Sequence, residues 1–373
     1  MNDDATRYKE YLQKKLLSET WKHLFTPENA AKMMDSEGLA EHATQVGENA
    51  AILVNWQRER LRNFAPDTPF EQPDVALFFQ PIMGRIDNAA KRIGFNPLNS
   101  VSLATSTDVG PSPSTLSTST GHTIFIGIGT GKFCNAWAKA YLGVARAIWT
   151  PGKEITKPTV DQVRATFAKD PDGLYVAFRL AVNFGLNETV VGVDDLMRGD
   201  AIFDSHKAHL LDSMEMFALA HEYVHCVAHE RYPVMRGILT RERAFELETI
   251  CDIFGVRLSQ ESTDDISNKL SLAGIGAVMF LRAMEISTLA RSLFVKSEPT
   301  SSSHPPIEDR IADIKKMIEA TAGPKTRDFV THSLDCYDGL AVSLKTLLLA
   351  LVFVKRDKLL AQSFKAPLPS DEK

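Results

Sequence analysis

The sequence predicts a mainly α-helical (α+β) fold, in which a small β-sheet flanks a helical core. Three observations support this prediction. Apolar residues recur at helical spacing over most of the chain from about Asp204 onwards. The run from His122 to Gly129 is rich in apolar and β-branched residues and has the composition of a strand. The chain has 373 residues, 44% of them hydrophobic and 24% charged, which is ordinary for a globular protein with a sizeable core.

Residues 1–95 are expected to form an N-terminal helical region that precedes a larger domain, 96–373. Apolar residues lie at helical spacing from Tyr8 to Leu24, from Ala50 to Phe64 and from Val75 to Ile93, where Gly94 ends the last helix. This region would regulate access to a site in the larger domain or recognise a partner.

The larger domain is expected to hold its active-site core within 120–315, followed by C-terminal helices. The polar, low-complexity segment from Pro111 to Gly121 reads as a loop before the strand. A helix is predicted from Lys132 to Trp149. A second β-rich piece is predicted from Leu174 to Phe184, because a strong turn signal precedes it.

A glycine-rich stretch, Gly127-Ile128-Gly129-Thr130-Gly131-Lys132, invites a nucleotide-binding interpretation. A phosphate-binding loop would need a glycine where Ile126 stands and a Ser or Thr where Phe133 stands, and the dinucleotide-binding spacing also fails. We therefore interpret the stretch as a strand that ends in a flexible turn.

Charge and hydropathy exclude several classes of protein. The formal net charge is -5 and no basic block occurs, so nothing indicates nucleic-acid binding. The acidic, polar N-terminus is not that of a secretory signal. The longest apolar runs, Thr346 to Val354 and Leu272 to Leu281, are shorter than a membrane span and are expected to be buried core helices. Four cysteines without a CxxC pair indicate a reducing compartment, the cytoplasm.

The most informative motif is His221-Glu222-Tyr223-Val224-His225, in a helix predicted over about 210–230. Residues four apart lie on the same face of a helix, so both histidines can bind one metal ion. Glu222 lies beside that ion, where it can act on a bound water. Zn²⁺ lowers the pKa of such a water to roughly 7, and a neighbouring carboxylate can take its proton. The motif predicts metal-assisted hydrolysis with one Zn²⁺ per chain.

A third ligand is expected from the acidic stretch between Arg241 and Asp252. Glu248 would bind the metal, and Asp252, one turn later, would accept the spare N–H of a ligating histidine and fix its tautomer. Glu242 and Glu246 are the alternative ligands, and a solvated helix face is the alternative to any metal role.

A third element begins at His304, which two prolines would hold just outside a helix, with Arg310 inside that helix. Either side chain could stabilise the oxyanion of a tetrahedral intermediate near zinc; a capped helix with a surface histidine is the alternative. Three further residues near the motif, Cys226, Cys251 and His229, are interpreted as buried thiols and a hydrogen-bonding or surface histidine rather than as ligands.

Together these elements resemble gluzincin metallopeptidases of the HtpX and CAAX-prenyl-protease type. Those enzymes carry HExxH, then a Glu with an Asp one turn later, then a His-Pro-Pro segment with Arg-Ile. The resemblance covers roughly 120–130 and 210–315, and the matching residues are His221, Glu222, His225, Glu248, Asp252, Ser302, His304, Pro305, Pro306, Arg310 and Ile311.

The resemblance implies a zincin-like helical metallopeptidase core with zinc bound by His221, His225 and Glu248. Glu222 would be the general base, and Asp252 would orient a ligand. His304 and Arg310 would contact the substrate or the oxyanion, and the strand from Thr123 to Ile128 resembles the edge strand along which such enzymes bind an extended peptide.

The family is largely membrane-embedded, whereas no spanning helix is expected here. Soluble phage-exclusion peptidases of the Lit type are a nearer biological analogue. The expected protein is therefore a cytoplasmic, soluble zinc endopeptidase, selective and regulated, with a protein or peptide substrate, a possible activating protein partner and a possible role in phage defence. The N-terminal region and the segment from Pro111 to Gly121 are the candidate gates. The alternative is a non-catalytic interaction protein with a structural zinc site.

Overall fold

A computed structural model describes residues 4–16, 26, 29, 32, 55, 58–119, 121–150, 153–167, 172–190, 201–232, 239–263, 274–295 and 304–363. The fold is mainly helical with one small sheet, as predicted. Its helices are α1 (Asp4–Leu16), α5 (Pro73–Arg92), α6 (Ile128–Ile148), α7 (Val160–Phe167), α8 (Asp172–Asn187), α9 (Ala201–Arg231), α10 (Arg241–Glu261), α12 (Ile275–Phe294), α13 (Ile307–Thr321) and α14 (Arg327–Ser363).

The sheet has three strands, β1 (Val101–Ser106), β2 (Ser114–Ser117) and β3 (His122–Gly127), in the order β1-β3-β2. β3 runs parallel to β1 and antiparallel to β2. The sequence therefore placed a strand correctly in this stretch, but the resemblance to an edge strand is wrong. β3 is the central strand and is buried along its whole length, whereas β2 is an edge strand. Part of the predicted loop from Pro111 to Gly121 is thus the first strand of the β2–β3 hairpin.

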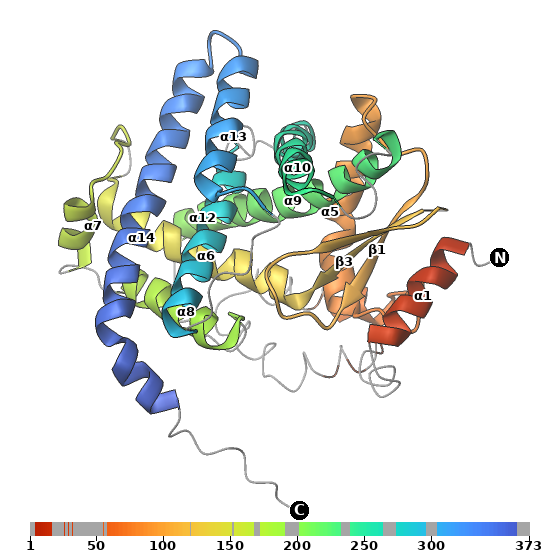
Figure 1. Cartoon of the computed structure of the whole chain (residues 1–373), viewed down its shortest axis with the longest axis horizontal. Helices are drawn as coiled ribbons and strands as arrows, with labels where there is room; N and C mark the ends of the chain where they lie inside the picture. The colour runs from red at the N-terminus through yellow and green to blue at the C-terminus, as the bar shows by residue number, and fades with distance from the viewer. Residues whose placement is uncertain are drawn as a thin grey trace, which may run out of the picture.

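The long helix α9 runs through the middle of the molecule (Figure 1). It packs against α10, α12, α6 and α5, and it also touches β2 and β3. The sheet and α1 lie toward one end of α9, and α14, α7 and α8 lie toward the other (Figure 1). Two buried apolar clusters meet along α9, one built mainly with α6, α8, α12, α13 and α14, the other with α5, β3 and α10. A helix that is apolar on nearly every side is a buried core helix.

The N-terminal elements are part of this packing. The helix predicted from Val75 to Ile93 is confirmed as α5, and Gly94 follows it with a φ of +66°. α5 packs in the same apolar cluster as α9 and α10. The helix predicted from Tyr8 is α1 in its first part. Of the segment from Ala50 to Phe64, residues 58–62 are helical, and residues 50–54, 56 and 57 lie outside the described residues. The domain boundary near residue 95 stays a prediction.

The β-rich piece predicted from Leu174 to Phe184 is wrong, because that segment is helix α8. Val176, Leu180 and Phe184 are all buried at a spacing of one helical turn. A short apolar run is compatible with either a strand or a buried helix, and the packing of α8 against α12 and α6 decides between them.

The glycine-rich stretch after β3 is not a flexible turn, since the chain passes directly from β3 into α6. A Cβ at Gly127 would lie 1.9 Å from the carbonyl oxygen of Asp108, and one at Gly129 would lie 2.2 Å from the carbonyl carbon of Val109. The segment between β1 and β2 crosses the start of α6 at these two positions. Close backbone packing therefore accounts for both glycines.

The stretch Arg327–Lys358 of α14 is long and apolar enough to cross a membrane by length and composition, a criterion that core helices of soluble proteins also meet. Half of its most apolar window is buried inside the molecule. Leu344, Leu348 and Val352 face the main apolar cluster, while Phe353 and Val354 are exposed. The expectation that both apolar runs are buried is met fully from Ile275 to Leu281 and only in part at the end of α14.

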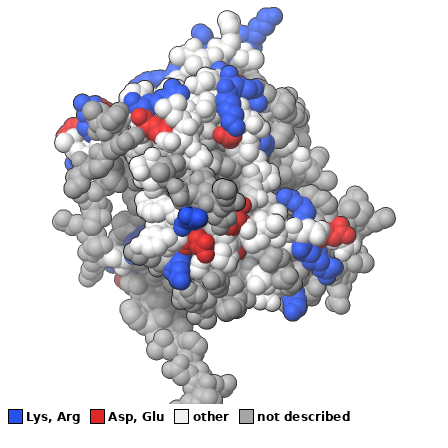
Figure 2. Space-filling model, turned by 90° about the vertical axis from the view of Figure 1, so that its right-hand side faces the viewer, with Lys and Arg blue, Asp and Glu red and all other residues white. Residues whose placement is uncertain are grey.

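The face of the molecule shown in Figure 2 carries its charged side chains in small, separate groups of both signs. On the part of this face that the structure describes, they form no continuous basic stripe. This distribution gives no indication of a nucleic-acid surface.

Candidate metal centre

The metal-binding motif lies in the middle of the buried part of α9, where the neighbouring residues Ala220, Tyr223, Val224 and Cys226 are fully buried. His221 is 8% exposed. Burial of the surrounding side chains fixes the rotation of the helix. As a result the histidine face points toward α10 and a cavity.

Helix α10 brings the third ligand to the two histidines. The Nε2 atoms of His221 and His225 are 3.2 Å apart, and they lie 3.4 and 3.5 Å from the carboxylate oxygens of Glu248. A tetrahedral ion bound at about 2.0–2.1 Å places its ligand atoms roughly 3.3 Å apart. The three side chains form a group that could hold a metal ion.

Two further observations fit a cation at this point. Oε2 of Glu248 is buried and accepts no hydrogen bond from any residue that the structure describes. Burial tends to raise the pKa of Glu248, but the two histidines outweigh burial and hold that pKa well below its usual range. A buried, ionised and unsatisfied carboxylate oxygen is a natural metal ligand.

The close approach of α10 to α9 depends on Gly255. A Cβ at this position would lie 3.1 Å from the backbone nitrogen of His221 and 3.2 Å from its Cα atom. The missing side chain lets the two helices pack backbone to backbone. This contact brings Glu248 and Asp252, both on α10, within reach of α9.

Asp252 lies behind the metal group, as predicted. Its Oδ1 is 3.0 Å from Nδ1 of His221, so this nitrogen donates to the carboxylate and Nε2 is left for a metal. Burial opposes charge on His221, but its hydrogen bond to Asp252 and the nearby Glu248 carboxylate raise its pKa to about 10. A metal ion that binds to His221 therefore displaces a proton, and its affinity falls as the pH falls.

Arg310 lies beside the metal group, and its main partner is Asp252. Its guanidinium donates to both oxygens of Asp252, from Nε at 2.6 Å and from Nη2 at 2.7 Å, while Nη2 lies 3.8 Å from Glu248. Burial raises the pKa of Asp252, but the bonds from Arg310 and His221 lower it below the usual range. Arg310 lines the cavity and also bonds to Asp252, the carboxylate that accepts from His221. Its predicted contact with the substrate or the oxyanion stays a prediction.

His304 lies at the mouth of the metal group. Pro306 is the N-cap of α13, and His304 precedes the two prolines as predicted. Its Nε2 is 3.4 Å from Oε2 of Glu248, and half of its side chain, 51%, is exposed. Burial by its surroundings lowers the pKa of His304, so the ring is neutral at pH 7.

Glu222 lines the same cavity as the two histidines and is hydrogen-bonded to β2. Oγ1 of Thr115 lies 2.8 Å from Oε2 of Glu222 and 3.0 Å from its backbone oxygen. Thr115 is not among the residues predicted for the site, because the polar run around it was predicted to be a loop. The alternation of Thr115, Leu116 and Ser117, short as it is, is the signal that could have indicated a strand.

A cavity of about 770 Å³ opens on the metal group. Polar residues of the motif, of β2 and of the His304 segment line one part of it. Apolar side chains from α9 and α12 line the other part, namely Phe217, Phe280, Leu281, Met284 and Leu289. The cavity can therefore hold a polar reacting group next to an apolar side chain.

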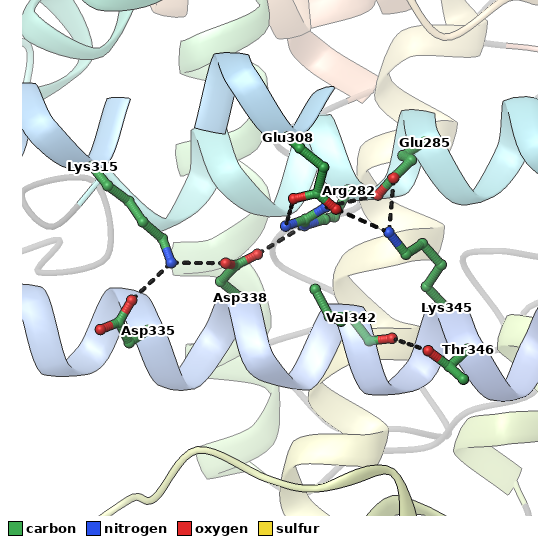
Figure 3. A network of polar contacts seen from close by, with 9 residues as sticks. All are labelled: Arg282, Glu285, Glu308, Lys315, Asp335, Asp338, Val342, Lys345 and Thr346. Atoms are coloured by element: carbon green, nitrogen blue, oxygen red, sulfur yellow. Dashed lines mark hydrogen bonds and ion pairs between the residues drawn. The ribbon is translucent and has the colours of Figure 1, made fainter. Parts of the chain in front are cut away.

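An ionic network surrounds the buried Arg282, and two of its members, Glu285 and Glu308, also line the cavity (Figure 3). Arg282 on α12 is 2% exposed and bonds to Glu285, to Glu308 on α13 and to Asp338 on α14. Its hydrogen bond to Glu308 lowers the pKa of that carboxyl to about 2. Lys345 bonds to Glu285 and Glu308 from α14. The network joins three helices and fixes the start of α13, which carries Arg310.

The rival ligands lie elsewhere. Glu246 pairs with Arg243 at an exposed position, and Glu242 is exposed at the start of α10. Cys226 and Cys251 are buried close to the motif, where burial raises the pKa of both thiols and keeps them protonated. Among the described residues, neither thiol belongs to the group of side chains that could hold a metal ion, in agreement with the prediction that both are buried core thiols.

The chain was compared with models of protein families, with curated proteins and with solved structures, and nothing matched in any of the three.

Proposed function

We propose that this protein is a zinc-dependent endopeptidase of the gluzincin type. One observation carries the proposal: three ligand atoms at tetrahedral spacing open onto a cavity beside a carboxylate, Glu222, that is not a ligand. A structural zinc site is normally closed by four protein ligands, whereas a hydrolytic site has three and an open position. Among the described residues, the group has three such ligands.

Zinc held by His221, His225 and Glu248 would supply an acidified water and polarise the scissile carbonyl. Glu222 would take one proton from the attacking water and deliver it to the amide nitrogen as the C–N bond breaks. Thr115 would hold the Glu222 carboxylate in place for both transfers. His304, neutral and half-exposed at the mouth of the metal group, would donate a hydrogen bond to the developing oxyanion.

The substrate would bind as an extended peptide along β2. Within the part of the chain that the structure describes, β2 pairs with β3 on one side only, and residues 112–115 line the cavity. An unpaired strand edge offers backbone donors and acceptors to a peptide. The apolar wall of α9 and α12 would then receive a large apolar side chain next to the scissile bond. We propose peptides with Leu, Met or Phe at that position as the preferred substrates.

Metal analysis and one isosteric variant test the proposal. We expect one zinc per chain, lost in the double variant His221→Ala/His225→Ala. Glu222→Gln keeps the shape and should retain zinc while hydrolysis falls at least ~10²-fold. If Glu222→Gln retained zinc but cleaved a peptide library as fast as the wild type, the catalytic assignment would be wrong. Stoichiometric zinc without cleavage of any peptide by either protein would favour the alternative, an interaction protein with a structural metal.

We further propose a cytoplasmic location and control by a partner. All four cysteines are free and buried, which suits a reducing compartment. A cytoplasmic endopeptidase has to be restrained, and the predicted gating segment contributes residues 112–115 to the cavity wall. Because α5 packs in the core with α9, deletion of residues 1–95 would disturb the site itself. Regulation should be tested with the full chain, where an activating protein is expected to raise kcat on a fixed peptide.

A further inference from the structure

A second pocket lies where α5, α6 and α9 meet, and none of the described residues that line it also lines the cavity at the metal group. Its volume is about 330 Å³, near the lower end of the range for small-molecule sites, ~300–1,000 Å³. Apolar side chains from the three helices form most of its wall, namely Val75, Phe78, Phe79, Ile128 and Leu211. The pocket can therefore receive the apolar part of a small molecule.

Gly131 is the glycine of the glycine-rich stretch that close backbone packing does not explain. It lies near the start of α6 and lines the pocket. A Cβ at this position would lie 3.4 Å from Cζ of Phe79 and 3.7 Å from Oε1 of Glu215, which are ordinary contact distances. Alanine would therefore fit here without strain, and it is the better helix former. What the glycine leaves open is space beside the Phe79 ring and the Glu215 carboxyl.

Glu215 is the buried polar side chain of this pocket. It is 2% exposed, and its Oε1 accepts no hydrogen bond from any residue that the structure describes. Arg85 lies close enough to attract Glu215, but it already forms an ion pair with Asp212. Burial, together with the negative charge of Asp212, raises the pKa of Glu215 well above its usual range. A buried carboxyl oxygen without a partner is costly, and a cation in the pocket would satisfy it.

The groups around the pocket favour an ammonium ion as that cation. Lys132 and Asp74 line the pocket, are exposed and carry opposite charges, and in the described part of the chain neither is bonded to Glu215. The rings of Phe78 and Phe79 pack edge to face with their centroids 5.0 Å apart, and the face of such a ring attracts a cation. An ammonium brings three N–H donors, and its charge favours the ionised form of the carboxyl.

We propose that this pocket binds a small organic amine, whose apolar body packs against Phe78 and Phe79 and whose ammonium group donates to Glu215. An inorganic cation would leave the apolar wall without a partner. A ligand with a carboxylate at its inner end would place a negative charge against Glu215. The site is separate from the metal group, and the proposal holds whether or not the chain is a peptidase.

Three probes test the ligand class in the full-length protein. Phenethylamine has a ring and an ammonium group, phenethyl alcohol has a neutral hydroxyl instead, and ethylamine lacks the ring. Calorimetric titration with a chelator present keeps amine coordination to a metal out of the measurement. We expect phenethylamine to bind with a dissociation constant of about 1 mM or tighter, and the other two to bind at least ~10-fold more weakly. No binding of phenethylamine, or equal binding of the alcohol, would overturn the proposal.

Three variants locate the bound amine. Glu215→Gln keeps the shape and removes the charge, so the affinity for phenethylamine should fall at least ~10-fold. Gly131→Ala places a methyl group against Phe79 and Glu215 and should lower the affinity too. Gly84→Ala is the matched control, because a Cβ there has nothing within 4 Å, and it should leave the affinity unchanged.

Circular dichroism shows whether each variant is folded, and the two pocket variants test the site independently of each other. Wild-type affinity in Glu215→Gln would contradict the proposal, since the carboxyl would then not hold the ammonium. Equal affinities in Gly131→Ala and Gly84→Ala would contradict it as well, because the amine would then bind elsewhere on the protein.

Discussion

Replacement of Asp252 by Leu tests the architecture behind the metal group. Asp252 is 1% exposed and accepts three N–H groups, two from Arg310 and one from His221. The substitution leaves the guanidinium of Arg310, itself 9% exposed, without its main partner. It also removes the acceptor that holds His221 in the tautomer with Nε2 free for a metal.

Two effects of different size are expected from this single change. Loss of one partner of a buried ion pair destabilises a protein by about 3–5 kcal/mol. Glu248, 3.8 Å from Arg310, retains part of the attraction, so the loss should lie near 3 kcal/mol. Loss of a carboxylate that orients a ligating histidine weakens metal binding roughly 10- to 100-fold.

The double variant Asp252→Leu/Arg310→Met separates the two effects. It removes both charges, and apolar replacements of a buried pair are often neutral or stabilising. Stability should therefore return close to the wild-type value, while zinc affinity stays low because His221 still has no acceptor. Asp313→Leu is the matched control, since Asp313 pairs with Lys316 at an exposed position of α13 and should contribute less than about 1 kcal/mol.

The assay has two independent readouts. Urea unfolding followed by circular dichroism in the presence of a chelator gives the stability of the metal-free protein, to which zinc linkage does not contribute. Competition with a chromophoric chelator gives the zinc affinity of the folded protein. If the double variant bound zinc as tightly as the wild type, Asp252 would not orient the ligand. If Asp252→Leu were as stable as Asp313→Leu, the buried pair would not be the element that holds α13 to α10.

Three further predictions address the neighbouring elements. Thr115→Val removes the hydroxyl that lies 2.8 Å from Oε2 of Glu222. It should lower kcat of the proposed peptidase roughly threefold to tenfold, with zinc content unchanged. An unaltered kcat would contradict the role of this hydrogen bond. Gly255→Ala places a Cβ 3.1 Å from the α9 backbone and should weaken zinc binding by moving α10 outward. The control is Gly84→Ala in α5, where a Cβ would have nothing within 4 Å and should raise helix stability by up to ~1 kcal/mol. Equal effects of the two variants on zinc affinity would argue against the close approach of α10 to α9. Burial raises the pKa of Asp338, but its bonds to Arg282 and Lys315 lower that pKa below the unfolded value of about 3.9. The contribution of Asp338 to folding stability is therefore present above that pH and is lost in acid. The stability difference between wild type and Asp338→Asn should be largest near pH 6 and shrink toward pH 3, and a difference independent of pH would refute this assignment.

Local periodicity was enough to predict the group of side chains that could hold a metal ion. His221 and His225 are one turn apart on α9, and Glu248 and Asp252 are one turn apart on α10. One helical turn places the two members of each pair on one face, whereas the meeting of the two pairs depends on how α10 packs against α9. The prediction that Asp252 would accept from a ligating histidine agrees with the structure for the same reason. The catalytic role of Glu222 and the identity of zinc remain predictions.

Packing between distant parts of the chain determined several contacts that sequence spacing does not predict. Arg310 bonds to Asp252 because α13 packs against α10, and no residue pattern in the His304 segment predicts that contact. Thr115 met Glu222 because β2 pairs with β3 and lies against α9. The segment from Leu174 to Phe184 became helical through its packing against α12 and α6.

The sequence by itself therefore determined the helical character of the chain and the set of residues able to bind a metal, since both depend on periods of a few residues. The tertiary structure alone decided which strand borders the cavity, which glycines admit a neighbouring backbone, and which polar groups orient the ligands. Hydrogen bonds of His122 on β3 with Glu230, and of Ser117 on β2 with His229, join the sheet to α9 between residues more than a hundred positions apart in the chain. Such contacts depend on how strands pair and helices cross, and no local pattern of residues records that.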